Sequence, residues 1–205
     1  MFTKKDLTFS IFTGIGTGLI IWRIFIFLKI SQFHHISFVW LAVIMPIFWI
    51  LGVNLGYLLG RWINFLSQFG KFVAIGFTNA AVDFGVLNLL LAFSSIGNFA
   101  LFKTISFLVA LVNSYLLNKH WAFEAGKTNG GGTEFIKFAS VATVSILINV
   151  GVASYIVKYI SPLFGFSAAI WANMAAIMGS AAALVISFLG FKLLVFKTRI
   201  DVLSN

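Results

Sequence analysis

Six long apolar stretches run along the chain, separated by short polar or charged segments. A helix needs about 20 apolar residues to cross the ~30 Å hydrocarbon core of a bilayer, and each stretch is long enough. The pattern therefore predicts an all-helical integral membrane protein with six transmembrane helices. The predicted spans are Leu7–Leu28, Ile36–Leu59, Phe72–Phe93, Phe99–Asn118, Ile136–Ile160 and Ser167–Phe191.

The amino-acid composition excludes several other classes of protein. Of the 205 residues, 60% are hydrophobic and 9% are charged, whereas soluble domains carry about 25% charged residues. Six spans leave no room for a soluble catalytic domain, and a chain without cysteine forms no disulfides and no thiolate-ligated metal sites. We expect no cofactor and no metal, and we interpret the neighbouring His34 and His35 as solvated loop residues.

Basic residues predict the orientation of the chain in the membrane. The first span is interpreted as retained, because it contains Arg23 and lacks a signal-peptide cleavage pattern. The net charge of +9 comes from single residues at span ends, which argues against nucleic-acid binding. Ten lysines and arginines fall on one side and four on the other, so the positive-inside rule predicts that both termini are cytoplasmic. The four are Arg23, Lys29, Lys103 and Lys158.

An internal repeat follows the first two spans. One match has an offset of 66 residues and the other an offset of 73. Each repeat is a two-span hairpin, and both copies enter the bilayer in the same direction because two is an even number. The matched pairs are Phe69 with Phe135, Lys71 with Lys137, Phe72 with Phe138, Lys119 with Lys192, and Phe123 with Phe196.

The repeat predicts the domain organisation. We expect an N-terminal hairpin at 1–62 and a four-helix domain at 63–200, with any central site between the two repeats. Repeat one covers 68–123 and repeat two 134–197, and a glycine-containing flexible cytoplasmic loop at 124–134 joins them.

Segments of the first repeat carry a family resemblance. Phe69 to Asn79 with Asp83, then Ser106-Phe107, then Asn113 to Phe123 resemble the GtrA-like family of small membrane proteins. In that family an aromatic-basic-Phe start, a mid-span acid and a span ending in Asn-basic-x-Trp-x-Phe recur. The resemblance covers about residues 68 to 197. The second repeat has Asn149 in place of the acid and Phe191 in place of the Asn, so we expect the two halves to differ in function.

The resemblance implies that the protein flips a polyprenyl-phosphate-linked monosaccharide across the cytoplasmic membrane of a prokaryote, for cell-envelope polysaccharide synthesis or glycosylation. It implies membrane glycosyltransferases as partners. One alternative is a non-transporting subunit that anchors or regulates a polyprenyl-phosphate glycosyltransferase. Another is a small ion or proton-coupled carrier centred on Asp83. An enzyme is not expected, because no side chains are placed for acid–base or nucleophilic chemistry.

Four repeat-related lysines are the candidate phosphate ligands. Lys71 and Lys137 begin the hairpins while Lys119 and Lys192 end them, so all four fall at one membrane level. Phosphate capture needs two or more basic groups. The alternative is that these lysines are topological anchors whose ammonium groups reach lipid headgroups. Trp121 is expected at the headgroup level, as in aromatic belts.

Polar residues inside the spans suggest a sugar path. Asp83 lies twelve residues after Lys71, hence ~18 Å deep. A carboxylate there costs at least about 2.5 kcal/mol, so it should face a polar cavity or be protonated. The alternative for such groups is interhelical hydrogen bonding. The candidates for a sugar path, or for proton coupling in the case of Asp83, are Asn79, Asp83, Asn113 and Asn118. A small-residue row on the last span suits close packing or a homo-oligomer: Ala168, Ala172, Ala176 and Ser180.

Overall fold

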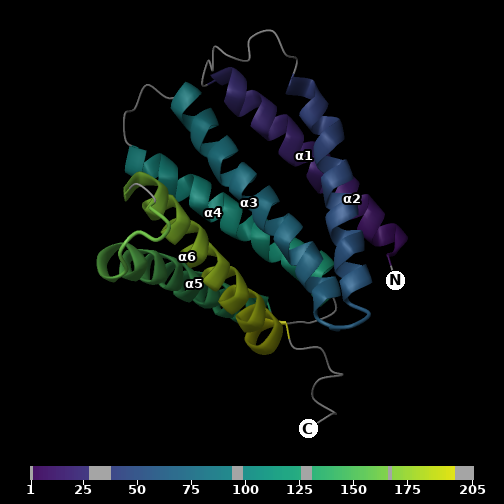
Figure 1. Cartoon of the computed structure of the whole chain (residues 1–205). Helices are drawn as coiled ribbons and strands as arrows, with labels where there is room; N and C mark the ends of the chain where they lie inside the picture. Colours follow the sequence, from purple (N-terminus) through teal and green to yellow (C-terminus); the bar gives the residue numbers. More distant parts are fainter. Residues whose placement is uncertain (1, 28–37, 94–98, 126–130, 166–167, 197–205) are drawn as a thin grey trace. The chain divides into compact units, whose positions relative to one another are not determined.

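The computed structural model describes residues 2–27, 38–93, 99–125, 131–165 and 168–196. Six helices among these residues are long and apolar enough to cross a membrane, which confirms the predicted fold class (Figure 1). The predicted loop residues His34 and His35 lie outside the described residues. The helices are α1 (Lys4–Phe27), α2 (Leu41–Leu59), α3 (Leu66–Phe93), α4 (Phe99–Leu117), α5 (Gly131–Tyr159) and α6 (Ala168–Gly190).

Three of the helices, α1, α3 and α5, begin earlier than the predicted spans, whereas α2 begins later, at Leu41 instead of Ile36. α3 begins at Leu66 instead of Phe72, so that Lys71 lies inside the helix. α5 begins at Gly131, which makes the loop predicted at 124–134 too long by the four residues 131–134. Glu134 is buried in the first turn of α5. An acid is favoured there because the N-terminus of a helix carries partial positive charge.

α4 and α6 both end in a five-residue π-helical turn, η3 (Asn118–Ala122) and η4 (Phe191–Val195). The Phe123 N–H donates to the Asn118 carbonyl at 2.9 Å, and the Phe196 N–H donates to the Phe191 carbonyl at 2.8 Å. The two turns begin 73 residues apart, at equivalent positions of the sequence repeat. The duplication therefore extends to an uncommon backbone feature. A short 3₁₀ helix, η2 (Phe38–Trp40), precedes α2.

The chain divides into two compact units, residues 1–126 with α1 to α4 and residues 127–205 with α5 and α6. In the first unit α1 and α2 pack against each other and against α3, and α3 also packs against α4 (Figure 1). This division joins the N-terminal hairpin to the first repeat. The domain division expected from the sequence, 1–62 and 63–200, stays a prediction.

Glycine permits close helix contacts in both units. A Cβ atom on Gly14 of α1 would lie 2.5 Å from the Cα atom of Pro46, which is buried inside α2. Gly179 of α6 likewise faces the backbone carbonyl of Asn149 in α5. Small residues matter here because the hydrophobic effect does not drive helices together in lipid, whereas close van der Waals packing does.

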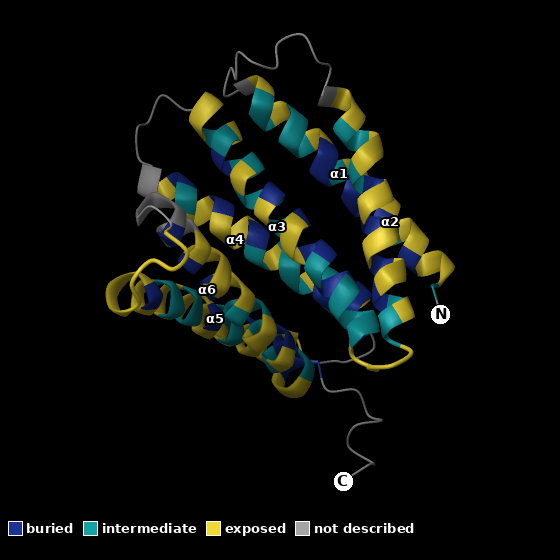
Figure 2. Cartoon of the chain, viewed as in Figure 1, coloured by how far each residue is buried: buried dark blue, intermediate teal, exposed yellow. Residues whose placement is uncertain are grey.

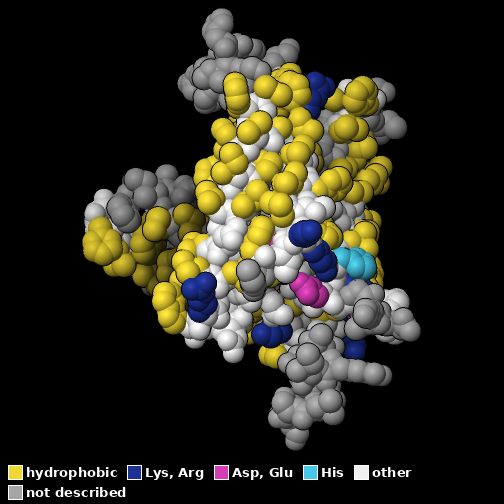
Figure 3. Space-filling model, turned by 90° about the vertical axis from the view of Figure 1, so that its right-hand side faces the viewer, with side chains coloured by type: hydrophobic (Ala, Val, Ile, Leu, Met, Phe, Trp, Pro, Cys, Tyr) yellow, Lys and Arg dark blue, Asp and Glu magenta, His cyan; other side chains and the backbone are white. Residues whose placement is uncertain are grey.

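Large apolar side chains cover the outward faces of the helices, while buried positions face neighbouring helices (Figure 2). Phe12, Phe48 and Phe77 are 77%, 58% and 63% exposed, as a lipid-facing surface requires. In the view of Figure 3, hydrophobic side chains cover the upper part of the face and most Lys and Arg side chains gather lower down. Polar and charged side chains are also buried in the interior, and they form the candidate site.

Candidate functional site

One face of α1 is polar and fully buried, which the analysis of the sequence did not predict. Four side chains at helical spacing point into the first unit, and each is at most 4% exposed. A polar inward face in a membrane protein requires partners within the bundle, since lipid supplies none. The four side chains are Asp6, Ser10, Thr13 and Thr17.

Asp6 is positioned by the first turn of α1. The sequence Thr3-x-x-Asp6 forms a reciprocal capping box, in which the Asp6 N–H donates to Thr3 Oγ1 at 3.2 Å. In return, Asp6 Oδ2 accepts hydrogen bonds from the Thr3 N–H at 2.9 Å and the Thr3 hydroxyl at 2.7 Å. The cap thereby fixes the carboxylate where the chain enters α1.

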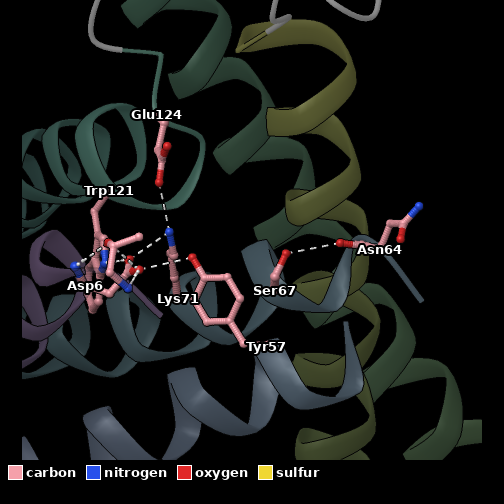
Figure 4. A network of polar contacts seen from close by, with 8 residues as sticks. Asp6, Tyr57, Asn64, Ser67, Lys71, Trp121 and Glu124 are labelled. Atoms are coloured by element: carbon pink, nitrogen blue, oxygen red, sulfur yellow. Dashed lines mark hydrogen bonds and ion pairs between the residues drawn. The ribbon is translucent and has the colours of Figure 1, made fainter. Parts of the chain in front are cut away.

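The carboxylate of Asp6 meets the first repeat lysine (Figure 4). Lys71 Nζ lies 2.8 Å from Asp6 Oδ1 and 3.0 Å from Glu124 Oε1. The Tyr57 hydroxyl donates to Asp6 Oδ2 at 3.1 Å, and Trp121 Nε1 donates to Asp6 Oδ1 at 3.1 Å. We call Thr3, Asp6, Tyr57, Lys71, Trp121 and Glu124 the Asp6 cluster. It ties α1, α2, α3 and the end of α4 together at one end of the unit.

The Asp6 cluster changes the interpretation of Lys71. This side chain is 3% exposed and two carboxylates neutralise it, so in this structure it is a buried counter-charge and does not present an open phosphate ligand. Asp6 was missed because a sequence gives no sign of which distant residue will meet it. The available signal was the Thr3-x-x-Asp6 capping box, which places an acid at the start of a span.

Trp121 also lies inside the unit. It is 0% exposed and its ring stacks on Phe9 of α1 at a centroid distance of 5.5 Å. Trp121 faces the bundle interior, because its indole N–H holds Asp6, and its expected position at the headgroup level stays a prediction.

The other three candidate lysines have more open surroundings. Lys119 is half-buried, and its Nζ lies 3.3 Å from the Tyr115 hydroxyl. Lys137 is exposed near the start of α5, and Lys192 is half-buried in η4. Lys71 and Lys119 belong to the first unit and the other two to the second. A common phosphate site for all four stays a prediction.

A row of polar side chains lies between α3 and α4. Asn113 Nδ2 donates to Asn79 Oδ1 at 3.4 Å. One turn further along α3, Asp83 Oδ1 accepts from the Ser106 hydroxyl at 2.6 Å, and Asp83 Oδ2 lies 2.5 Å from Lys103 Nζ. We call these five residues the α3–α4 seam. Three of the four predicted path residues thus come together, and Asp83 is paired rather than isolated.

Asn118, the fourth predicted path residue, lies in η3 and is 1% exposed. Its Nδ2 donates to the Ser114 carbonyl at 2.8 Å, whereas its Oδ1 has no hydrogen-bond partner among the described residues. In the part of the chain that the structure describes, no group of three or more His, Asp or Glu side chains could hold a metal ion.

Six spanning helices, an apolar surface and buried polar clusters define a multi-pass membrane protein whose last four spans are a duplicated hairpin. Residues 71–200 match the family model described as the GtrA/DPMS transmembrane domain, and the chain belongs to this family. The resemblance predicted from the sequence is thereby confirmed. The match begins at Lys71, so α1, α2 and Asp6 lie outside the family domain.

The chain is also similar to the uncharacterized membrane protein YngA of Bacillus subtilis (strain 168). The two are 26% identical over 142 residues, which cover 67% of this chain and 86% of the relative. No solved structure matches the chain.

Proposed function

We propose that the protein translocates a polyprenyl-phosphate-linked monosaccharide across the cytoplasmic membrane of a prokaryote. The observation that carries the proposal is the α3–α4 seam, which places amide, carboxylate, ammonium and hydroxyl groups between two spans of a GtrA/DPMS family domain. Such a protein makes and breaks no covalent bond. Its task is to lower the free energy of a polar headgroup inside hydrocarbon.

The seam suits the hydroxyl groups of a sugar. A hydroxyl that leaves water without a new partner costs several kcal/mol in an apolar medium, on the order of 2–7. Asn79 and Asn113 are both half-buried and offer donors as well as acceptors. Their mutual hydrogen bond is long, at 3.4 Å, so a sugar hydroxyl replaces a weak contact.

The phosphate requires cations, and among the four repeat lysines the exposed one is Lys137 of the second repeat. Lys137 and Lys192 are the counterparts of Lys71 and Lys119, and they lie beside Phe138 and Phe191, whose rings stack at a centroid distance of 4.2 Å. Charge-assisted hydrogen bonds from these ammonium groups favour a phosphate over a neutral headgroup. The polyprenyl chain stays in lipid, against the exposed apolar faces of the helices.

The proposal is tested by reconstitution. Purified protein in proteoliposomes should move a polyprenyl-phosphate monosaccharide between leaflets, and Asn113→Leu should slow this transport about tenfold, equivalent to about 1.4 kcal/mol. Asn54→Leu is the matched control, because Asn54 is exposed on α2 and bonds the carbonyl of Ile50 in its own helix. Wild-type protein that moves no lipid-linked sugar would overturn the proposal. If folded Asn113→Leu transports at the wild-type rate, the α3–α4 seam has no role in the proposed transport.

A second candidate is the non-transporting subunit that anchors or regulates a glycosyltransferase. Arg61, Trp62 and Ile63 lie exposed on the connection between α2 and α3, with Trp62 77% exposed. Arginine and aromatic side chains are enriched in protein interfaces. This function predicts a glycosyltransferase that co-purifies with wild type and is lost in Trp62→Ser, without transport by the protein alone. The carrier centred on Asp83 receives less support, because Lys103 already neutralises Asp83.

A further inference from the structure

A groove of about 390 Å³ lies between α1 and α3, near the end of α3 that is remote from the Asp6 cluster. Apolar side chains line most of it, among them Ile20 and Ile24 of α1 and Val86 and Leu89 of α3. The two helices meet closely beside it, since a Cβ atom on Gly85 would lie 2.5 Å from Ile20 Cγ2. An apolar groove of this kind binds a hydrocarbon chain.

A single cation lines the same groove. Arg23 of α1 is exposed, and no hydrogen bond or ion pair joins it to the described residues. Arg23 lies near the end of α1, where the long arginine side chain reaches the membrane surface and the phosphate groups found there. Its planar guanidinium binds phosphate through two parallel hydrogen bonds. The groove and Arg23 together are complementary to a molecule that joins an apolar chain to a phosphate.

The location favours the transported lipid over a random membrane lipid. Within the first unit, the repeat lysines Lys71 and Lys119 lie near the start of α3 and just after the end of α4, whereas Arg23 lies beside the far end of α3. Cations at both ends of the unit would lower the free energy of a phosphate at both sides of the bilayer. Among described cations at the opposite ends, Lys103 is paired with Asp83, and Lys158 Nζ lies 5.2 Å from the centroid of the Tyr159 ring. Arg23 combines an apolar groove with a charge that has no partner among the described residues.

We propose that the α1–α3 groove holds the polyprenyl chain of a lipid phosphate while Arg23 binds its phosphate, at the leaflet opposite Lys71 and Lys119. The identity of the lipid rests on the proposed function. The site itself uses α1, which lies outside the family domain, so it gives the N-terminal hairpin a role in lipid binding.

The test uses the absence of native cysteine in the sequence. Ala92→Cys places one thiol in the groove, at the end of α3, and its maleimide labelling is followed in the full chain. A long-chain polyprenyl monophosphate should slow the labelling about tenfold, whereas the neutral polyprenol should have a much smaller effect because it lacks the phosphate that Arg23 binds. A thiol at exposed Ile63, on the α2–α3 connection, should label at the same rate with and without the probe.

Two further changes separate headgroup from chain. Arg23→Gln should remove the protection by the monophosphate, whereas Arg61→Gln, an exposed arginine on the α2–α3 connection, should leave it intact. Val86→Phe fills the groove and should remove protection by both probes. Both Arg23 and Arg61 are exposed, so these variants are expected to fold like wild type.

Three results would overturn the proposal: no protection in the otherwise wild-type background, protection that survives Arg23→Gln, or equal protection by phosphatidylglycerol, which would mark a site for ordinary anionic lipid. Protection without transport in proteoliposomes would retain the site and reject the proposed function. Transport without protection of the thiol would retain the proposed function and reject the site in the groove.

Discussion

The hairpins α3–α4 and α5–α6 share a backbone plan and differ in the side chains that complete it. Both end in a π-helical turn, and an equivalent aromatic pair packs beside each turn. The centroid distance is 6.3 Å for Phe72 and Phe123, and 6.0 Å for Phe138 and Phe196. Both hairpins thus keep the same backbone turn and the same aromatic packing beside it.

At the lysine end the two hairpins diverge. Lys71 is buried against Asp6, whereas its counterpart Lys137 is exposed. Phe191 replaces Asn118 and stacks on Phe138, and the counterpart of Trp121 is Leu194, which is 60% exposed. The cause lies outside the repeat, because Asp6 comes from α1. One motif lysine has become a structural counter-charge, and its copy remains open to a ligand.

The opposite ends differ as well. The ion pair of Asp83 and Lys103 has the neutral counterparts Asn149 and Ala176, and the counterpart of Ser106 is Gly179. Asn149 Nδ2 instead donates to Ser180 Oγ at 3.3 Å. The first hairpin therefore carries the polar seam, whereas the second hairpin is neutral at these positions and keeps Lys137 exposed.

The largest expected effect separates Lys71 from Lys137. Lys71→Met leaves Asp6 buried without its cation and should lower the free energy of unfolding by about 3–5 kcal/mol. Lys137→Met removes an exposed charge and should change it by less than about 0.5 kcal/mol. Both values are measured by denaturant titration in detergent. Adding Asp6→Asn to Lys71→Met should recover much of the loss, because the unpaired carboxylate is then gone. Equal effects of the two lysine variants would contradict the comparison.

This difference also shows what the sequence can and cannot predict. The six spans follow from hydropathy because the bilayer sets the length of an apolar helix. The π-helical turns are not predicted, although the repeat offset of 73 residues also separates them. The cost of a mid-span acid predicts that Asp83 faces a polar cavity or is protonated, and the structure pairs it with Lys103 and Ser106. Neither the ion pair of Asp6 with Lys71 nor that of Lys103 with Asp83 is predicted. Each pair joins residues of different helices, and only the packing of those helices brings them together.

The second prediction concerns variants that introduce into the α5–α6 hairpin the ion pair of the α3–α4 hairpin. Asn149→Asp introduces a carboxylate where Ala176 stands in place of Lys103, and it should cost about 2.5–3.5 kcal/mol of stability. Adding Ala176→Lys rebuilds the ion pair and should recover part of that loss. The same titration measures both variants. If Asn149→Asp unfolds no more easily than wild type, the neutral character of the second hairpin is not required by its surroundings.

The third prediction concerns Gly179, the counterpart of Ser106. Gly179→Ser restores the hydroxyl of the first hairpin, but its Cβ atom would collide with the Asn149 carbonyl. Overpacking of this kind costs about 1–3 kcal/mol. Gly151→Ser on α5 is the control, since nothing lies within 4 Å of its Cβ position. A stable Gly179→Ser variant would show that the close contact between α5 and α6 is not needed.

The smallest expected change in stability decides between packing and transport. Asn149→Ala removes one interhelical hydrogen bond from α5–α6, and Asn79→Ala removes one from α3–α4. Such bonds contribute about 0.6 kcal/mol on average in membrane proteins, so the two variants should lose equally little stability. Their transport rates should differ, because Asn79 belongs to the α3–α4 seam while Asn149 holds only its own hairpin together. Equal transport in both variants would assign Asn79 the same packing role as Asn149, and the two hairpins would then differ in charge without differing in function.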